Sequence, residues 1–133
     1  MTNLLLDTSV LIDHLREYKP ATDFIETVFF SGVPVTISVV TELELYAGKS
    51  VENPAIEEAV IKLLDLFKVL PVTSNIARQA GRLLRRHRHQ GLTPIDAIIA
   101  GTAIEHNANL ITRNTKHFRM IKGILVFDIP TDR

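Results

Sequence analysis

Asp7 is the first side chain in the sequence whose position suits chemistry. It closes the segment NLLLD, in which Leu4, Leu5 and Leu6 predict a short buried strand. In α/β proteins, ligands bind beyond the carboxyl ends of the strands, so a carboxylate here is a candidate for binding or catalysis. A structural role fits equally well, because Asp7 could form an Asx turn or cap a helix that begins near Ser9.

Two more carboxylates lie in the apolar stretch SVVTELELYAGK, which predicts a helix over 38–49. Glu42 and Glu44 leave such a helix on nearly opposite sides. The neighbours of Glu44 at three and four residues are all small or β-branched, namely Val40, Thr41, Ala47 and Gly48. They allow another element to approach closely, so Glu44 is the candidate for a pocket and Glu42 is expected to lean towards solvent.

Asp96 has both a structural and a functional interpretation. With Thr93 as the N-cap and Pro94 at the first helical position, it completes a T-x-x-D variant of the capping box. Against that interpretation, the next four residues are wholly apolar, which is typical of a central helix packed on a sheet. The first turn of this helix is therefore expected to lie against the sheet and not in bulk water.

The elements that must position these acids alternate along the chain. We predict strands over 3–7, 33–37, 68–72, 109–112 and 124–128. We predict helices over 9–17, 20–31, 38–49, 53–67, 75–89 and 94–107. Alternating strands and helices predict an α/β fold, with a mostly parallel central sheet flanked by helices in three layers, and a single domain over residues 1–133.

Local signals fix several ends of these elements. Asn53, Ser74 and Thr93 are the expected N-caps of the last three helices, and Gly91 is expected to end the helix over 75–89. Pro71 lies inside the third predicted strand and indicates an edge position or an early end, because proline cannot donate to a sheet.

Composition excludes some classes of protein. The 133 residues include no cysteine, which excludes disulfides and thiolate metal sites. Hydrophobic residues make up 46% and charged residues 23%, as in folded proteins, and no apolar run is long enough to span a membrane. The start MTNLLLDTS lacks the features of a secretory signal, so a cytoplasmic protein is expected.

Basic residues are concentrated in part of the chain, although the net charge is zero. No acid occurs between Asp65 and Asp96, and a stripe with helical spacing runs through this span, formed by Arg78, Arg82, Arg85 and Arg86. Such a stripe can bind phosphates of a polyanion. A solvated helix face with no ligand is the alternative interpretation.

Three motifs, in order, resemble those of the PIN-domain ribonucleases, most closely the VapC toxins of toxin–antitoxin pairs. LLLDTSVLID resembles the opening strand and first acid, Asp7. SVVTELELYAG resembles the family's S-x-x-T-x-x-E-L-x-x-G segment, which selects Glu44 and not Glu42. DAIIAGTAIEHNANLITRNTKHF resembles the third-acid helix, at Asp96, and the strand that follows it. The resemblance covers nearly the whole chain.

The resemblance implies a ribonuclease that depends on Mg²⁺ or Mn²⁺. Asp7, Glu44 and Asp96 are the implied catalytic acids and metal ligands, and Asn114 is a further candidate ligand or holder of a metal-bound water. The residues implied to orient these ligands or a water are Thr8, Ser9 and Thr112. The residues expected to grip RNA are Arg113, Lys116, Arg85 and Arg86.

One departure from the family pattern concerns the number of metal ions. Many relatives place a fourth acid around the positions of Asn114 and His117, where this sequence has neither Asp nor Glu. Asn114 can offer a carbonyl oxygen but no negative charge. A one-ion site on three carboxylates is intact, and the sequence leaves a second ion open.

The resemblance also implies two protein partners. A cognate antitoxin would block the site by inserting a segment near the acids, and a homodimer would pair through apolar surfaces, offered by Phe24, Val28, Phe29 and Phe30 or by the helix over 53–67.

Other functions remain compatible with the sequence. A housekeeping RNA-processing nuclease, or a PIN-like domain that binds RNA or a partner without cutting it, would share these motifs. A haloacid-dehalogenase-type phosphatase is set aside, because Ser9 stands where its second acid would be. His87 and His89 are two residues apart on a helix, cannot bind one ion together and are expected at the surface.

Overall fold

The protein is built on a five-stranded sheet, shown in a computed structural model that describes residues 3–131. The strands are β1 (Asn3–Leu6), β2 (Val35–Ser38), β3 (Lys68–Leu70), β4 (Ala108–Ile111) and β5 (Val126–Phe127). Their order is β3-β2-β1-β4-β5, and every neighbouring pair is parallel. The predicted α/β class with a parallel sheet is therefore confirmed.

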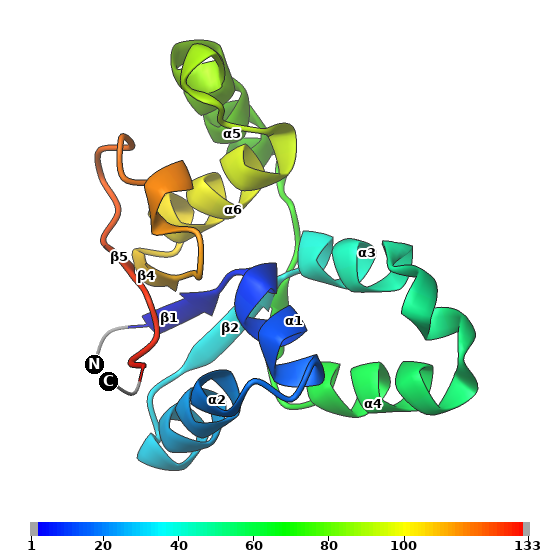
Figure 1. Ribbon diagram of the computed structural model, residues 1–133. Helices are drawn as coiled ribbons and strands as arrows, with labels where there is room; N and C mark the ends of the chain where they lie inside the picture. Colours follow the sequence, from blue (N-terminus) through cyan, green and yellow to red (C-terminus); the bar gives the residue numbers. More distant parts are fainter. Residues whose placement is uncertain (1–2, 132–133) are drawn as a thin grey trace.

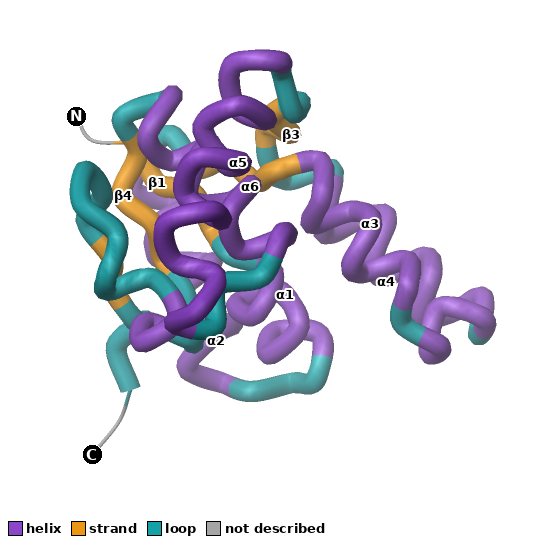
Figure 2. The backbone as a smooth tube through the Cα atoms, turned by 90° about the horizontal axis from the view of Figure 1, so that it is seen from above, coloured by secondary structure: helices purple, strands orange, loops and turns teal. Residues whose placement is uncertain are grey.

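Helices cover both faces of this sheet (Figure 1). The helices are α1 (Thr8–Leu15), α2 (Lys19–Ser31), α3 (Val39–Ala47), α4 (Pro54–Leu64), α5 (Ser74–His87) and α6 (Pro94–Glu105), with short 3₁₀ turns η1 (Lys49–Glu52), η2 (Arg88–Gln90) and η3 (Thr115–His117). α5 and α6 lie together on one face, α1 and α2 lie on the other, and α3 and α4 extend to one side of the sheet, as a second view confirms (Figure 2). This is the expected three-layer arrangement.

Each face of the sheet has its own hydrophobic core. Successive side chains of a strand point to opposite faces, so Leu5 joins the core beneath α5 and α6, whereas Leu6 joins the core with α1 and α2. Leu110 and Ile111 of β4 divide in the same way. All four side chains are buried, which explains why these strands read as continuous apolar runs.

The sequence signals for element ends are largely confirmed. The side chains of Asn53 and Thr93 cap α4 and α6, and Pro71 follows β3, which is an edge strand that ends at Leu70. The prediction for Ser74 is wrong. Helix α5 begins at Ser74 itself, and the hydroxyl of Thr73 accepts the capping hydrogen bond from the amide of Ile76.

The sheet has one topological switch point. The chain proceeds from β1 outwards to β2 and β3, and then returns to add β4 and β5 on the other side of β1. β1 and β4 therefore end side by side with their connections leading in opposite directions, and Leu6 pairs with Ile111 at that end. Crevices at such points bind ligands in open α/β sheets. Asp7 and Thr112 are the next residues of these two strands.

The length and hydropathy of the helices bear on whether the described part of the chain could span a membrane. Among residues 3–131, none of the helices is both long and apolar enough to cross a bilayer.

Candidate active site at the switch point

Asp7 is almost completely buried, and two hydroxyl groups hold its carboxylate. Its Oδ2 accepts hydrogen bonds from Thr112 Oγ1 at 2.7 Å and from Ser9 Oγ at 3.0 Å. Asp7 occupies the N-cap position of α1, but its side chain makes no capping hydrogen bond. Helix capping by the carboxylate therefore does not explain the residue, and its bonds lead instead to the end of β4.

The backbone after β4 orients both hydroxyls. The amide of Arg113 donates to Ser9 Oγ at 3.0 Å, and the amide of Asn114 donates to Thr112 Oγ1 at 3.0 Å. Because each oxygen accepts a backbone N–H, its own proton is left to point at Asp7. Ser9 and Thr112 therefore orient the Asp7 carboxylate, and their expected roles towards a metal ion or a water stay predictions.

Glu44 is held from the start of α1. Thr8 Oγ1 donates to Glu44 Oε1 at 2.5 Å and lies 2.9 Å from Thr41 Oγ1. The single hydroxyl proton of Thr8 goes to Glu44, so Thr41 must be the donor in the second contact. A chain of two hydroxyls, with the buried Thr41 at its inner end, thus fixes the carboxylate. Glu42 takes no part in this chain.

The charges of the three acids act on one another. Burial raises the pKa of Asp7 most strongly, the bonds from Thr112 and Ser9 lower it, and the negative charge of Asp96 raises it again. Burial also raises the pKa of Glu44, the bond from Thr8 lowers it, and the charges of Asp7 and Asp96 raise it further. Three carboxylates that stand at positions 7, 44 and 96 of the chain are therefore close neighbours in space.

Asp96 lies in the first turn of α6. Its amide donates to the hydroxyl of Thr93 at 3.2 Å, which is one half of the expected capping box. Its carboxylate does not complete the box; one oxygen lies 3.7 Å from Nδ1 of His117, and 17% of the side chain is exposed. The carboxylate is therefore available to a ligand. His117 is its neighbour from η3.

The donor chemistry of the site suits a hard divalent ion, because it consists of carboxylate oxygens supported by hydroxyls. Their mutual repulsion is the electrostatic condition that a cation relieves. Within residues 3–131, however, no three His, Asp or Glu side chains are close enough together to enclose an ion as they stand. A metal ion therefore fits the site in charge and donor type, and its coordination stays a prediction.

The other predicted ligand and the predicted RNA contacts differ in their surroundings. Asn114 is exposed at the start of η3. Lys116, Arg85 and Arg86 are exposed as well. Arg113 differs from them, because its guanidinium is only 24% exposed and forms ion pairs with Asp13 and Asp128. Its expected grip on RNA stays a prediction, but the group is already occupied.

One prediction about histidine is wrong. His87 is buried, with 9% exposed, and its Nδ1 forms a hydrogen bond of 2.7 Å with Gln90 Oε1. The residue continues the buried stripe of α5 that includes Ala80 and Leu83, so its helical spacing could have predicted its burial.

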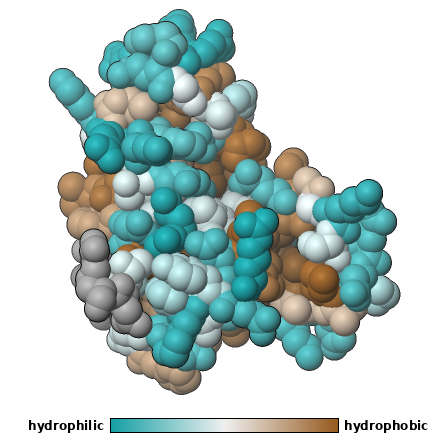
Figure 3. All heavy atoms as spheres, in the orientation of Figure 1, coloured by the Kyte–Doolittle hydropathy of each residue, from teal (hydrophilic) through white to brown (hydrophobic). Residues whose placement is uncertain are grey.

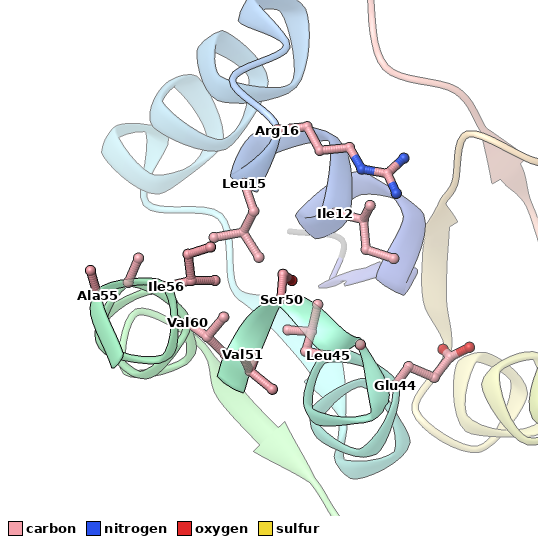
Figure 4. A pocket seen from close by; sticks show the side chains of 12 residues that line it. Ile12, Leu15, Arg16, Glu44, Leu45, Ser50, Val51, Ala55, Ile56 and Val60 are labelled. Atoms are coloured by element: carbon pink, nitrogen blue, oxygen red, sulfur yellow. The ribbon is translucent and has the colours of Figure 1, made fainter. Parts of the chain in front are cut away.

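An apolar groove is lined in part by Glu44. It has a volume of about 510 Å³ and is bounded by α1, α3, η1 and α4. Apolar atoms are exposed in the hollow between the body of the protein and the arm formed by α3 and α4 (Figure 3). Glu44 stands at the edge of this groove with its carboxylate directed towards α6, and Arg16 stands over α1 (Figure 4).

Comparison with known proteins identifies the family. Residues 4–123 match the PIN domain model. Ribonuclease VapC10 of Mycobacterium tuberculosis is 39% identical over 98% of this chain and 97% of its own length, and ribonuclease VapC19 of the same organism is 38% identical over 90% and 95%. A toxin–antitoxin complex from Klebsiella pneumoniae contains a chain that superimposes with a TM-score of 0.75 at 30% identity, covering 92% of this chain and 95% of that one. The chain therefore belongs to the PIN-domain family, among relatives of the VapC ribonucleases.

Proposed function

We propose that this protein is a metal-dependent ribonuclease and the toxin of a toxin–antitoxin pair. The observation that carries the proposal is the position of Asp7, Glu44 and Asp96 around the switch point, where burial, and to a smaller extent the charges of the neighbouring acids, raise the pKa of Asp7 and Glu44. The names of the relatives support the same activity. Asp7 is buried and Glu44 is half-buried, so the repulsion between their negative charges destabilises the fold. A functional role would account for this cost.

A divalent ion, when bound, would neutralise the charge of a scissile phosphate and lower the pKa of a bound water. We propose Asp7, Glu44 and Asp96 as its ligands, directly or through water, with Asn114 as a further candidate. Mg²⁺ and Mn²⁺ are the expected ions, since both favour oxygen ligands.

The residues around these ligands have separate tasks. Ser9 and Thr112 hold Asp7 in one orientation, and Thr8 holds Glu44. Hydroxyls that orient metal-binding carboxylates keep the site in its productive arrangement and limit the loss of entropy on binding. His117 lies beside Asp96 and can donate a hydrogen bond to that carboxylate or to a phosphate.

Basic residues near the acids supply the proposed contacts with RNA. Lys116 follows β4 closely, and Arg85 and Arg86 lie in the last turn of α5, near the loop that leads to the first turn of α6. All three are exposed, so their charges can reach phosphates. A solvated helix face remains the alternative for the two arginines.

We propose that the antitoxin occupies the groove beside Glu44. The groove is lined mainly by apolar side chains, including Ile12, Leu45 and Val60, and Glu44 also lines it. A segment with apolar side chains could therefore bind there and cover the site. The homodimer and the cytoplasmic location stay predictions; Phe29 and Phe30 are exposed, with 48% and 85% of their surface accessible, and offer one surface for pairing.

Two substitutions on one helix test the proposal. Glu44→Gln should lower the rate of RNA cleavage in Mn²⁺ by at least about 100-fold, because it removes a ligand charge, and EDTA should abolish cleavage by the wild type. Glu42→Gln is the matched control and should cleave as the wild type does. Equal loss in both variants, or cleavage that survives EDTA, would contradict the proposal. RNA binding without cleavage by the wild type would favour the non-cleaving alternative.

A further inference from the structure

Arg113 is enclosed by groups from three separate segments. Its Nη1 donates to Asp128 Oδ1 at 3.1 Å, and its Nε lies 3.1 Å from Asp13 Oδ2 as an ion pair without the alignment of a hydrogen bond. The guanidinium carbon lies 5.1 Å from the centre of the Tyr18 ring. Asp13 belongs to α1, Tyr18 precedes α2, and Asp128 follows β5. The Arg113 side chain, just after β4, therefore contacts two residues in the N-terminal part of the chain and one in the C-terminal part.

These contacts disfavour a role in gripping phosphate. Two carboxylates surround one guanidinium, so the cluster has an excess of one negative charge at neutral pH. To bind a phosphate, Arg113 would have to leave both partners and the aromatic ring, or bring an anion up to two carboxylates. Lys116, three residues on, is exposed and meets neither obstacle.

The backbone of the same residue leads directly to the acids. The amide of Arg113 donates to Ser9 Oγ at 3.0 Å, and Ser9 Oγ donates to Asp7 Oδ2 at 3.0 Å. The neighbouring Thr112 donates to the same carboxylate oxygen. The ion pairs on both sides of the Arg113 guanidinium therefore fix the backbone of residues 112–113. That backbone segment orients the Ser9 and Thr112 hydroxyls towards Asp7.

We propose that Arg113 is a positioning residue, which sets the orientation of Asp7 through the Ser9 and Thr112 hydroxyls and does not bind RNA. The inference rests on the proposed function, because it assigns a task within the same site. The ion pairs with Asp13 and Asp128 hold the guanidinium in place. Removing either carboxylate should therefore disturb the orientation of Asp7 in the same way as removing the arginine. Groups that orient metal ligands commonly change metal affinity by about 10-fold to 100-fold when they are removed.

The test compares Arg113→Gln and Asp128→Asn with the wild type, and Lys68→Gln, which removes a positive charge from an exposed position on the edge strand β3, serves as the control. Mn²⁺ affinity is measured by calorimetry, RNA affinity in EDTA by filter binding, and kcat and KM by cleavage. All measurements are made at a temperature where circular dichroism shows full folding. We expect both cluster variants to bind Mn²⁺ at least about 10-fold more weakly and to lose kcat, with RNA affinity in EDTA within about twofold of the wild type. Arg113→Lys should restore part of both losses, since it keeps the charge but not the planar fork.

Other outcomes overturn the inference. If Arg113 binds RNA, Arg113→Gln lowers the RNA affinity measured in EDTA. Asp128→Asn then releases the arginine from its ion pair and raises that affinity. If Arg113 only stabilises the fold, the melting temperature falls while Mn²⁺ affinity and kcat stay unchanged. Should Arg113→Gln fail to fold, Asp128→Asn decides alone, because that side chain is 44% exposed. A wild type that neither binds Mn²⁺ nor cleaves RNA would refute the proposed function and this inference together; an active wild type with unaffected variants would refute the inference only.

Discussion

Thr112→Val removes the shortest hydrogen bond to Asp7 with little change in side-chain shape. The hydroxyl of Thr112 is fully buried, donates to Asp7 Oδ2 at 2.7 Å and accepts the amide of Asn114 at 3.0 Å. Valine replaces this hydroxyl by a methyl group at the same position. The carboxylate then keeps the bonds from the Ser9 hydroxyl and the Thr8 backbone, and a buried charge loses part of its compensation.

The expected cost follows from the charge of the acceptor. A hydrogen bond to a charged group contributes about 1.5–3 kcal/mol, so we expect the free energy of unfolding to fall by about 2 kcal/mol. For a chain of this length, that loss corresponds to a decrease of about 7 °C in melting temperature. The bond also lowers the pKa of Asp7, so its removal should raise that pKa further.

A double-mutant cycle with Asp7→Asn isolates the bond. Thermal unfolding is followed by circular dichroism in EDTA at neutral pH. In the Asp7→Asn background, Thr112→Val removes a bond between neutral groups and should cost about 1 kcal/mol or less. An equal cost in both backgrounds would show that the hydroxyl does not act through the carboxylate, and the proposed support of Asp7 would then be wrong.

Three further results are expected. Asp7→Asn should raise the melting temperature of the metal-free protein at neutral pH, because the raised pKa of Asp7 means that its ionised form destabilises the fold. The gain in melting temperature should vanish as the pH falls to the ordinary pKa range of Asp, where the wild-type carboxyl is protonated. Gly101→Ala should lower the free energy of unfolding in urea by about 1–3 kcal/mol, because its Cβ would lie 3.2 Å from the carbonyl oxygen of Ile76 in α5. Gly81→Ala is the control: its Cβ would meet no atom within 4 Å, so it should raise the free energy of unfolding by about 0.8 kcal/mol. Removing the charge of Arg86 should reduce the salt dependence of RNA binding by about 0.7 in the log–log slope if that residue contacts a phosphate, and an unchanged slope would favour a solvated face.

Much of the fold could be predicted because its signals are local. Asn53 before Pro54 and Thr93 before Pro94 fix the starts of two helices within the sequence itself. Pro71 correctly indicated an edge strand, since its missing N–H is incompatible with a central position. The error at Ser74 was one residue, because Thr73 and Ser74 can both cap a helix and only the backbone conformation decides between them.

The arrangement of the three candidate acids was predictable to the extent that helix geometry and strand order determine it. Helical neighbours separated Glu44 from Glu42, and the end of an apolar strand marked Asp7. The partners of these acids were harder to foresee. Thr41 reaches Glu44 only through Thr8, across a separation of 33 residues, and such a contact exists only once the sheet has formed.

The surroundings of Arg113 show the limit of reasoning from sequence. Its neighbours Asp13 and Asp128 lie 100 and 15 positions away and meet it only because β4 lies between β1 and β5. A basic residue beside a motif suggests contact with substrate, whereas the structure surrounds this one with carboxylates. The spacing of charges along a chain does not reveal which of them will be paired.

Anomalous diffraction from crystals soaked in Mn²⁺ tests most directly whether the acids form one metal site. We expect a single strong anomalous peak among the carboxylate oxygens of Asp7, Glu44 and Asp96, and no peak at that place in Asp96→Asn crystals. A peak elsewhere on the protein, or none among these three side chains at a concentration of Mn²⁺ that supports RNA cleavage, would contradict the proposed metal-dependent site.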